Sequence, residues 1–331
     1  MRLPAWAVWL LAFAACLDAD PGKVLFSAAG DVMISRDVAD KMRKEGSGVP
    51  FSGIAPILKT RDLAFCNLEG TLSDRGAPRG KGFLFRSHPD SVAGLFSSGF
   101  NMFSLANNHA NDFGSNALLD TRMVLEKHGF HCAGAADNAW GALEPAMIEK
   151  NGLRIAFFAF RELPFKGGKP RDPQPAVPDS QSLVASIRAA RLNADFVIVS
   201  YHWGVKYRHL PTLFQKRFAE LSIDAGADLV LGHHPHALQP IVKYKEKFIF
   251  YSLGNCIFDQ EFPMANESIL VSCTLEKHAV SDMVLMPLLI RNCRPEPASG
   301  GDLARITGRI RDYCASAGIT LTAKGPQILV K

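Results

Sequence analysis

The strongest constraint on the fold is a series of short apolar runs that alternate with amphipathic segments. The runs are KVLFSAAGD, DLAFCNLEG, FNMFSLANNH, LRIAFFAF, DFVIVSYHWG, ADLVLGHHPH and KFIFYSLGN. Each is rich in Val, Ile, Phe or Leu, and most end at Gly, Asn or Asp, as buried strands do. Strands that are buried on both faces and alternate with helices predict an α/β protein with a layered sheet core.

The amphipathic segments between these runs carry helix start and stop signals. One predicted helix begins with Ser115 as its N-cap and ends at Gly129. A second starts at Asp179, and a third runs from Pro211 to Gly226. Ser and Asp are favoured N-caps, Pro is tolerated in the first turn, and Gly commonly follows the last turn.

Composition and charge limit the class of protein. The chain has 331 residues, of which 47% are hydrophobic and 21% charged, and its net charge is +5. This composition suits a globular protein, and the length allows one large domain or two modest ones. Lys and Arg are spread along the chain without a basic tail, and no helix-turn-helix or RNA-binding pattern is visible. Nucleic acid is therefore not an expected partner.

The N-terminal residues 1–19 have the features of a secretory signal. MRLPAWAVWLLAFAAC has one Arg near its start, followed by an uncharged apolar run that is too short to span a bilayer. Residues 12–14 offer a small-x-small cleavage site, whereas residues 14–16 offer a weak lipobox that would place a lipid on Cys16. We expect an exported protein of the periplasm or cell envelope, either free or lipid-anchored. The alternatives are an uncleaved anchor and a buried N-terminal helix.

Cysteine usage is compatible with export. Of seven cysteines, loss or lipidation of Cys16 leaves six, an even number for an oxidising compartment. Cys293 and Cys314 both lie in the C-terminal segment and are the pair expected to form a disulfide. Cys66 and Cys256 lie inside apolar runs, where a buried free thiol is the usual state. No CxxC motif occurs, which argues against a zinc ribbon or a thioredoxin-type site.

Polar side chains follow several of the predicted strands directly. They are Asp31, Glu69, Asn107, Asn108, His109, His202, His234 and His236. Ligands of open α/β sheets bind at the carboxyl edge of the strands, so segments that are distant in sequence would meet there. Carboxylate, carboxamide and imidazole groups together are typical of a metal site.

Each residue also has a structural interpretation. Asp31 could be a turn former or N-cap, and Asn107 with Asn108 could form a turn. His202 could be a packed ring whose nitrogens bond the backbone. The histidines of GHHPH are harder to explain in this way, because clustered imidazoles need a shared partner or abundant water.

The chain resembles the CapA family of poly-γ-glutamate and capsule biosynthesis proteins over residues 24–260. The matching segments, in order, are GDVMISRDV, NLEGTL, FLFRSHP, SLANNHANDFG, YHWGVKY, GADLVLGHHPHALQP and YSLGNCIFDQ. The resemblance implies a metallophosphatase-like (calcineurin-like phosphoesterase) fold, a sandwich of two mixed β-sheets flanked by helices. Residues 261–331 are expected to add closing strands and a C-terminal helix to the same domain.

The resemblance also implies roles for single residues. The implied metal ligands are Asp31, Glu69, Asn108, His202, His234 and His236. His109 matches the catalytic histidine that protonates a leaving group or steadies the attacking oxygen. Residues two apart in an extended chain project to the same side, which groups His234 with His236 and leaves His233 facing elsewhere.

One position departs from the wider superfamily. Met33 stands where a ligand histidine is usual, and a thioether is a poor ligand for Mn²⁺ or Fe²⁺. The resemblance implies one or two divalent ions, of Mn, Fe or Zn. The Met33 difference leaves open a dinuclear site, a mononuclear site and a site without metal.

The expected function is metal-dependent hydrolysis of a phosphoester or a polymer amide during capsule or poly-γ-glutamate synthesis or export. Its expected partners are an anionic envelope polymer or phosphoester substrate and membrane proteins of capsule synthesis. Cationic side chains near the motifs suit an anionic substrate, although for each one taken singly a solvated surface position is the more usual explanation: Arg36, Arg86, Lys206 and Arg208. The alternatives are a non-catalytic envelope factor that binds an anionic polymer and a stand-alone periplasmic protein that binds metal or another ligand.

Overall fold

The computed structural model describes residues 20–80, 82–162, 169–260, 262–315 and 317–331. The expected export signal, including Cys16 and its alternative lipid anchor, lies outside the described residues. Among the described residues, no helix combines the length and the apolar character needed to cross a membrane.

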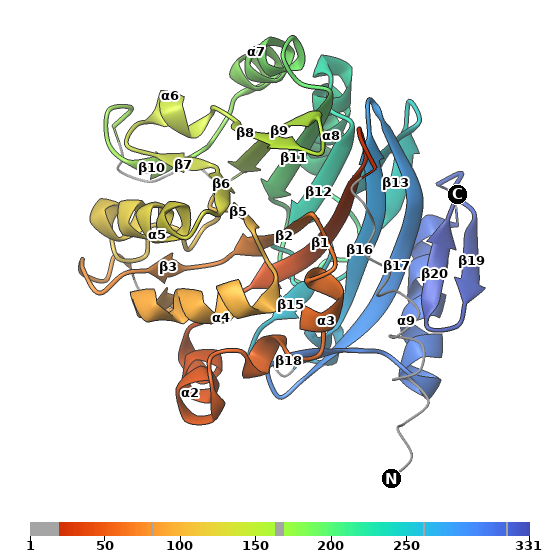
Figure 1. The fold of residues 1–331 in the computed structure, drawn as a ribbon, viewed down its shortest axis with the longest axis horizontal. Helices are drawn as coiled ribbons and strands as arrows, with labels where there is room; N and C mark the ends of the chain where they lie inside the picture. Colours follow the sequence, from red (N-terminus) through yellow and green to blue (C-terminus); the bar gives the residue numbers. More distant parts are fainter. Residues whose placement is uncertain (1–19, 81, 163–168, 261, 316) are drawn as a thin grey trace.

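The larger of two main sheets has ten strands (Figure 1). Its order is β19 (Leu321–Lys324), β20 (Gln327–Val330), β17 (Ala279–Arg291), β16 (Glu267–Glu276), β1 (Val24–Val32), β2 (Leu63–Leu68), β5 (Met102–Ser104) and β6 (His131–Ala133), while β15 (Asn255–Ile257) pairs with β1 and β18 (Arg294–Pro297) with β17. Strands β1, β2, β5, β6 and β15 are parallel to their neighbours in this group, and β16 to β20 pair antiparallel. The sheet is therefore mixed.

The second main sheet has six strands and is also mixed. Its order is β13 (Ile241–Tyr244), β14 (Lys247–Phe250), β12 (Leu229–His233), β11 (Phe196–His202), β9 (Leu153–Arg161) and β8 (Ala146–Lys150). The four central strands are parallel, and the two edge strands pair antiparallel with them. Two small sheets complete the strands: β3 (Thr71–Leu72) with β4 (Arg86–Ser87), and β7 (Ala135–Ala136) with β10 (Gln174–Pro175).

Most helices cover the outer faces of this sandwich, whereas α9 (Gly300–Cys314) contacts β17 of the larger sheet and β13 of the smaller one (Figure 1). The α-helices are α2 (Arg36–Glu45), α3 (Ala55–Leu58), α4 (Val92–Ser98), α5 (Ser115–Lys127), α6 (Ala139–Ala142), α7 (Ser180–Arg191), α8 (Leu213–Ala225) and α9 (Gly300–Cys314). The 3₁₀ helices are η2 (Val49–Phe51), η3 (Pro89–Ser91) and η4 (Pro263–Asn266). Buried side chains of α7 and α8 pack with the six-stranded sheet, whereas those of α2, α4 and α5 pack with the larger one.

The parallel strands are buried on both faces because alternate side chains enter two different cores. Phe65 of β2 packs between the two sheets with Phe157 of β9, while its neighbours Ala64 and Cys66 face the helices on the other side. This period of two explains why the strands read as continuous apolar runs rather than alternating ones. The architecture confirms the predicted α/β sandwich of two mixed sheets flanked by helices.

The helix signals are largely confirmed. Asp179 caps α7 and Thr212 caps α8, each through a capping box with the residue three positions later. The third helix therefore starts two residues after the predicted Pro211. Ser115 is the first residue of α5 rather than its cap, because Gly114 occupies the N-cap position.

The predicted disulfide between Cys293 and Cys314 is wrong. Cys314 is a buried free thiol on α9 in the core between the sheets, whereas Cys293 packs against the core on the opposite face of the larger sheet. The two residues share the C-terminal segment but lie on different faces of a strand layer. Cys66 and Cys256 are buried free thiols, as predicted.

Candidate metal centre

Two buried carboxylates form the base of the candidate site. Asp31 lies near the end of β1 and Glu69 directly follows β2, and the two strands run parallel with Asp31 beside Asn67 in register. Asn67 Nδ2 donates to Asp31 Oδ1 over 2.8 Å, and the His234 amide donates to Asp31 Oδ2 over 3.1 Å. Both oxygens of Glu69 are buried without a hydrogen-bond partner among the described residues.

The two carboxylates differ in pKa although both are fully buried. Burial alone would raise the pKa of Asp31, but its hydrogen bond to His236 and the neighbouring imidazoles lower it below the usual range. Burial raises the pKa of Glu69, and the His236 charge only partly offsets this effect. Asp31 is therefore stabilised as an anion, whereas the charges around Glu69 do not fully compensate the cost of burying its carboxylate.

His236 completes a first group of donors with these carboxylates. Its Nδ1 lies 2.8 Å from Asn255 Oδ1 and 3.5 Å from Asp31 Oδ2. Its Nε2 lies 3.8 Å from Glu69 Oε1 and is buried without a hydrogen bond. Burial would lower the pKa of His236, but Glu69 and Asp31 outweigh that effect and raise it.

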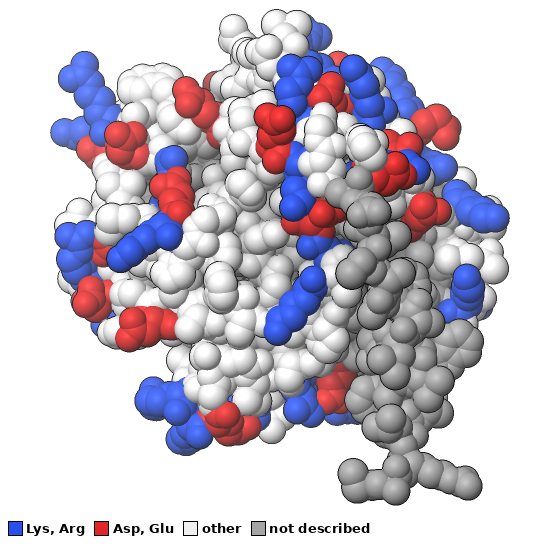
Figure 2. Space-filling model, in the orientation of Figure 1, with Lys and Arg blue, Asp and Glu red and all other residues white. Residues whose placement is uncertain are grey.

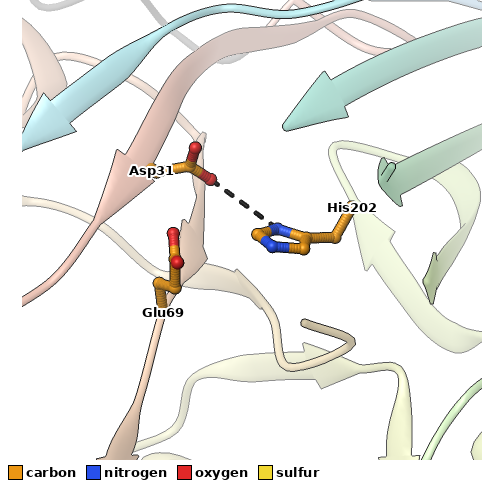
Figure 3. A group of neighbouring side chains, drawn as sticks. All are labelled: Asp31, Glu69 and His202. Carbon is orange, nitrogen blue, oxygen red and sulfur yellow. Dashed lines mark ion pairs between the residues drawn. The ribbon is translucent and has the colours of Figure 1, made fainter. Parts of the chain in front are cut away.

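A second group consists of one amide and two imidazoles. His202 Nε2 lies 2.6 Å from Asn108 Oδ1 and 2.9 Å from His234 Nδ1. His202 Nδ1 lies 3.9 Å from Asp31 Oδ1, so Asp31 joins the two groups. Figure 3 shows the side chains of Asp31 on β1, Glu69 after β2 and His202 on β11 close to one another, and one ligand atom from each lies within 4.8 Å of the others.

The two imidazoles of the second group are kept neutral. Burial, and then the neighbouring His234, lower the pKa of His202 well below its ordinary value. Burial and the His236 charge lower the pKa of His234 to about 3. A neutral imidazole keeps a ring nitrogen lone pair for a metal ion.

His109 lies beside the first group and is held from two sides. Its Nδ1 is 2.7 Å from Asp112 Oδ2, and its ring stacks on Phe85 with centroids 3.9 Å apart. Its Nε2 is buried without a hydrogen bond and lies 3.6 Å from Glu69 Oε1. The backbone amide of His109 donates to Asn107 Oδ1, which explains the use of the first asparagine of the NNH motif.

His233 faces elsewhere, as predicted. Its Nε2 lies 3.2 Å from the Ala29 carbonyl oxygen, and its ring packs edge-on against Phe65 in the core between the sheets. The prediction that an extended chain projects His234 and His236 to the same side is wrong, however. Strand β12 ends at His233, and both later histidines have left-handed backbones, with φ of 94° and 52°. A turn, not an extended chain, brings their rings to 5.9 Å.

Met33 does not take the place of a ligand. Its side chain is fully buried in the core outside the sheet, and its Sδ accepts hydrogen bonds from the Ser35 amide and hydroxyl at 3.2 and 2.8 Å. The Met33 thioether therefore packs in the core and bonds the turn between β1 and α2.

The structure adds polar residues that the sequence analysis did not assign to the site. They are Asn67, Asp112, Arg161 and Asn255. Arg161 and Asn255 each follow an apolar run, as the assigned residues do, so the same signal could have found them. Asn67 lies inside a strand, and Asp112 lies in the loop beyond His109, so neither carried that signal.

The four cationic side chains considered near the motifs differ in their surroundings. Arg36 pairs with Asp259 at 3.1 Å, and the Arg86 guanidinium lies 4.2 Å from the Phe113 ring. Lys206 and Arg208 are exposed on the loop after β11, and the Lys206 charge lowers the pKa of both Glu69 and His234. Figure 2 shows basic and acidic side chains interspersed over the face that it draws.

The donor set fits a divalent cation. Four buried atoms in one cluster lack hydrogen-bond partners among the described residues: Glu69 Oε1, Glu69 Oε2, His109 Nε2 and His236 Nε2. A buried carboxylate without partners is costly unless a cation compensates its charge. Fold and site together define an α/β protein with a candidate carboxylate–imidazole metal centre at the carboxyl edges of two facing sheets.

Comparison with known proteins identifies the family. Residues 25–260 match the family described as bacterial capsule synthesis protein PGA_cap. The chain is 32% identical over 286 residues to the PGA biosynthesis protein CapA of Bacillus subtilis (strain 168), covering 85% of this chain and 75% of that protein. It is 31% identical over 289 residues to the capsule biosynthesis protein CapA of Bacillus anthracis, covering 84% and 70%. The chain belongs to the PGA_cap family.

Among solved structures, a hypothetical protein from Thermus thermophilus aligns with a TM-score of 0.45 and 15% identity. The alignment covers 82% of this chain and 95% of that one.

Proposed function

We propose that this protein is an exported component of capsule or poly-γ-glutamate synthesis that hydrolyses a phosphoester or a polymer amide with a bound divalent metal. Family membership and the names of the Bacillus relatives support the synthesis context, and with it an anionic polymer as partner. The export signal expected in residues 1–19 supports a location in the periplasm or cell envelope.

The observation that carries the catalytic part is the isolation of Glu69. Its carboxylate is buried with both oxygens unbonded, between two imidazoles whose facing nitrogens are also unbonded. A buried carboxylate without hydrogen bonds is costly unless a cation compensates its charge. Asp31, Glu69 and His236 would hold one ion, and Asn108, His202 and His234 would hold a second one beside Asp31. When bound, such an ion polarises the target oxygen and activates water.

The remaining chemistry belongs to the chain itself. Asp112 fixes the tautomer of His109 by accepting from Nδ1, which leaves Nε2 to bond a reacting oxygen or nitrogen. Phe85 covers one face of the ring and prevents it from turning away. His109 is thus placed to protonate the leaving atom or to stabilise the developing charge.

The first test is the metal content of residues 20–331, purified without a metal-binding tag and measured by elemental mass spectrometry. We expect one or two equivalents of Mn, Fe or Zn in the wild type and near zero in the double variant His234→Ala, His236→Ala. His128→Ala is the matched control, because the exposed His128 ring lies at the end of α5, where its Nδ1 bonds the Val124 carbonyl oxygen and the ring stacks on Phe130. No metal in the wild type after loading with all three ions would overturn the proposal.

The second test is turnover of bis(p-nitrophenyl) phosphate and of poly-γ-glutamate by the metal-loaded protein. We expect release of p-nitrophenol or of shorter polymer, and its loss in Asn108→Ala. Polymer binding without turnover of either compound would refute the hydrolase and leave a polymer-binding factor.

A further inference from the structure

Arg161 is a buried cation at the edge of the candidate site. It is the last residue of β9 and lies beside His202 of β11 in the parallel register. Its exposure is 7%, and it is the one Lys or Arg that is buried in the described part of the chain. Burial lowers the pKa of its guanidinium to about 10, so the group remains charged at neutral pH.

The guanidinium forms no direct ion pair with a carboxylate of the described residues, and Asp112 acts on it only through its charge. The guanidinium has five N–H donors. One of them, on Nη1, donates to the Asn107 carbonyl oxygen at 3.1 Å. Its Nε is buried without a partner, and no carboxylate of the described residues forms an ion pair with it. A buried guanidinium without a direct ion pair is costly, and a bound anion would lower this cost.

The neighbouring carboxylates are already engaged. Asp112 Oδ2 accepts from the Phe85 amide at 2.8 Å and lies 2.7 Å from His109 Nδ1. Glu162 Oε2 accepts from the Gly204 amide at 2.7 Å, on the loop after β11. Neither carboxylate forms a hydrogen bond or an ion pair with Arg161 in the described part of the chain, although the Asp112 charge raises the pKa of the guanidinium.

We infer that Arg161 binds an oxyanion, a carboxylate or phosphate group, through its free guanidinium donors. A planar guanidinium can donate to two oxygens of such a group at once, which an ammonium cannot do. The bond to Asn107 ties this anion site to the loop that carries Asn108 and His109. If the proposed function holds, the anion is a carboxylate or phosphate of the substrate next to the group that is cleaved; the oxyanion site itself does not require metal.

The test is isothermal titration calorimetry on protein stripped of metal with a chelator and dialysed into chloride buffer. The probes are inorganic phosphate and a short poly-γ-glutamate oligomer. We expect the wild type to bind at least one probe and Arg161→Lys to bind it about 10- to 100-fold more weakly, because a charge-assisted hydrogen bond is lost. Arg154→Lys is the matched control, since Arg154 lies on the same strand but is half-exposed and paired with Asp195. Binding of phosphate alone indicates a phosphate ligand, and binding of the oligomer alone a carboxylate ligand.

Two results would overturn the inference: no binding of either probe by the wild type, or equal affinity in wild type and Arg161→Lys. Circular dichroism of each variant separates a lost fold from a lost site. If Arg161→Lys does not fold, the wild type alone decides: at equal ionic strength, phosphate or the oligomer must raise its thermal midpoint above that in chloride. Because metal is absent from every sample, anion binding and the hydrolase activity can fail independently.

Discussion

His109 and Asp112 form a buried imidazole–carboxylate pair in which Oδ2 lies 2.7 Å from Nδ1. The same Oδ2 accepts from the Phe85 amide, and the Phe85 ring stacks on the imidazole. Asp112 therefore holds both the His109 ring and the Phe85 residue that stacks on it. The opposite nitrogen, Nε2, is the ring atom left for chemistry beside Glu69.

Replacing Asp112 with Asn should slow hydrolysis without removing metal. The amide oxygen can still accept from the Phe85 amide, but the neutral side chain no longer offers His109 Nδ1 a charged acceptor. We expect a fall in kcat of about 10- to 100-fold, and about 10²- to 10⁴-fold for His109→Ala. The measurement is turnover at saturating substrate together with metal content. Asp120→Asn is the control, because Asp120 is a buried carboxylate that bonds Arg75 and Ser73 instead.

Replacing Met33 with Leu should leave the metal content unchanged. The Met33 thioether is bonded by Ser35 and packed in the core, so it contributes volume rather than a ligand. The conserved volume limits the packing cost to less than about 1.5 kcal/mol of unfolding free energy, and loss of the acceptor for the buried Ser35 amide and hydroxyl adds to it. Elemental analysis and urea denaturation check both parts. Loss of an equivalent of metal from Met33→Leu, at a stability near that of the wild type, would show that the thioether is a ligand.

The strand-end residues could be predicted because the signal is local. Asp31, Glu69 and His202 each lie at or just after the end of an apolar run, and parallel strands bring such ends to one edge. Periodicity therefore predicted both the layered fold and the place where polar groups gather.

The remaining features depend on register and turns, which a local pattern does not encode. Asn67 and Asn255 reach the site because each lies beside Asp31 on a neighbouring strand. His234 and His236 meet through a left-handed turn. The wrong disulfide has the same origin: nearness of Cys293 and Cys314 in sequence says nothing about which face of the sheet each one occupies.

Replacing Gly30 with Ala should lower the stability of the protein and the amount of metal that it binds. A Cβ at position 30 would lie 2.0 Å from the Gly254 carbonyl oxygen, which accepts from the Asp31 amide. The added methyl group would push β15 away from β1 and displace Asn255, the partner of His236. Overpacking of this kind costs about 1 to 3 kcal/mol. We expect a lower urea midpoint and a lower metal content.

The control for this substitution is Gly308→Ala in α9, where a Cβ would meet nothing within 4 Å. Alanine in a helix interior is favoured over glycine by about 0.8–1.0 kcal/mol, so this variant should be more stable than the wild type. Equal effects of the two substitutions would contradict the close approach of β1 and β15.

The neutral state of His234 predicts that the metal-free protein loses stability in acid. Its pKa is lowered by burial to about 3 in the folded state, against 6.5 for the free side chain. Below pH 6.5 the unfolded chain takes up a proton that the folded chain does not. The stabilising contribution is therefore fully present above pH 6.5 and is lost as the pH falls toward 3, with a slope of about 1.4 kcal/mol per pH unit for one proton.

Urea denaturation of wild type and His234→Asn between pH 4 and pH 8, with a chelator present, measures this slope. Asn does not titrate. Below pH 6.5, the free energy of unfolding of the variant should therefore fall less steeply with pH, by about 1.4 kcal/mol per pH unit. His202 shares the effect, because its Nε2 lies 2.9 Å from His234 Nδ1 and its own pKa is lowered by burial and by His234. At pH 8 both imidazoles are neutral, and the difference there reports packing alone. An unchanged slope in His234→Asn would mean that His234 takes up its proton over the same pH range in the folded and the unfolded chain, and that burial does not lower its pKa.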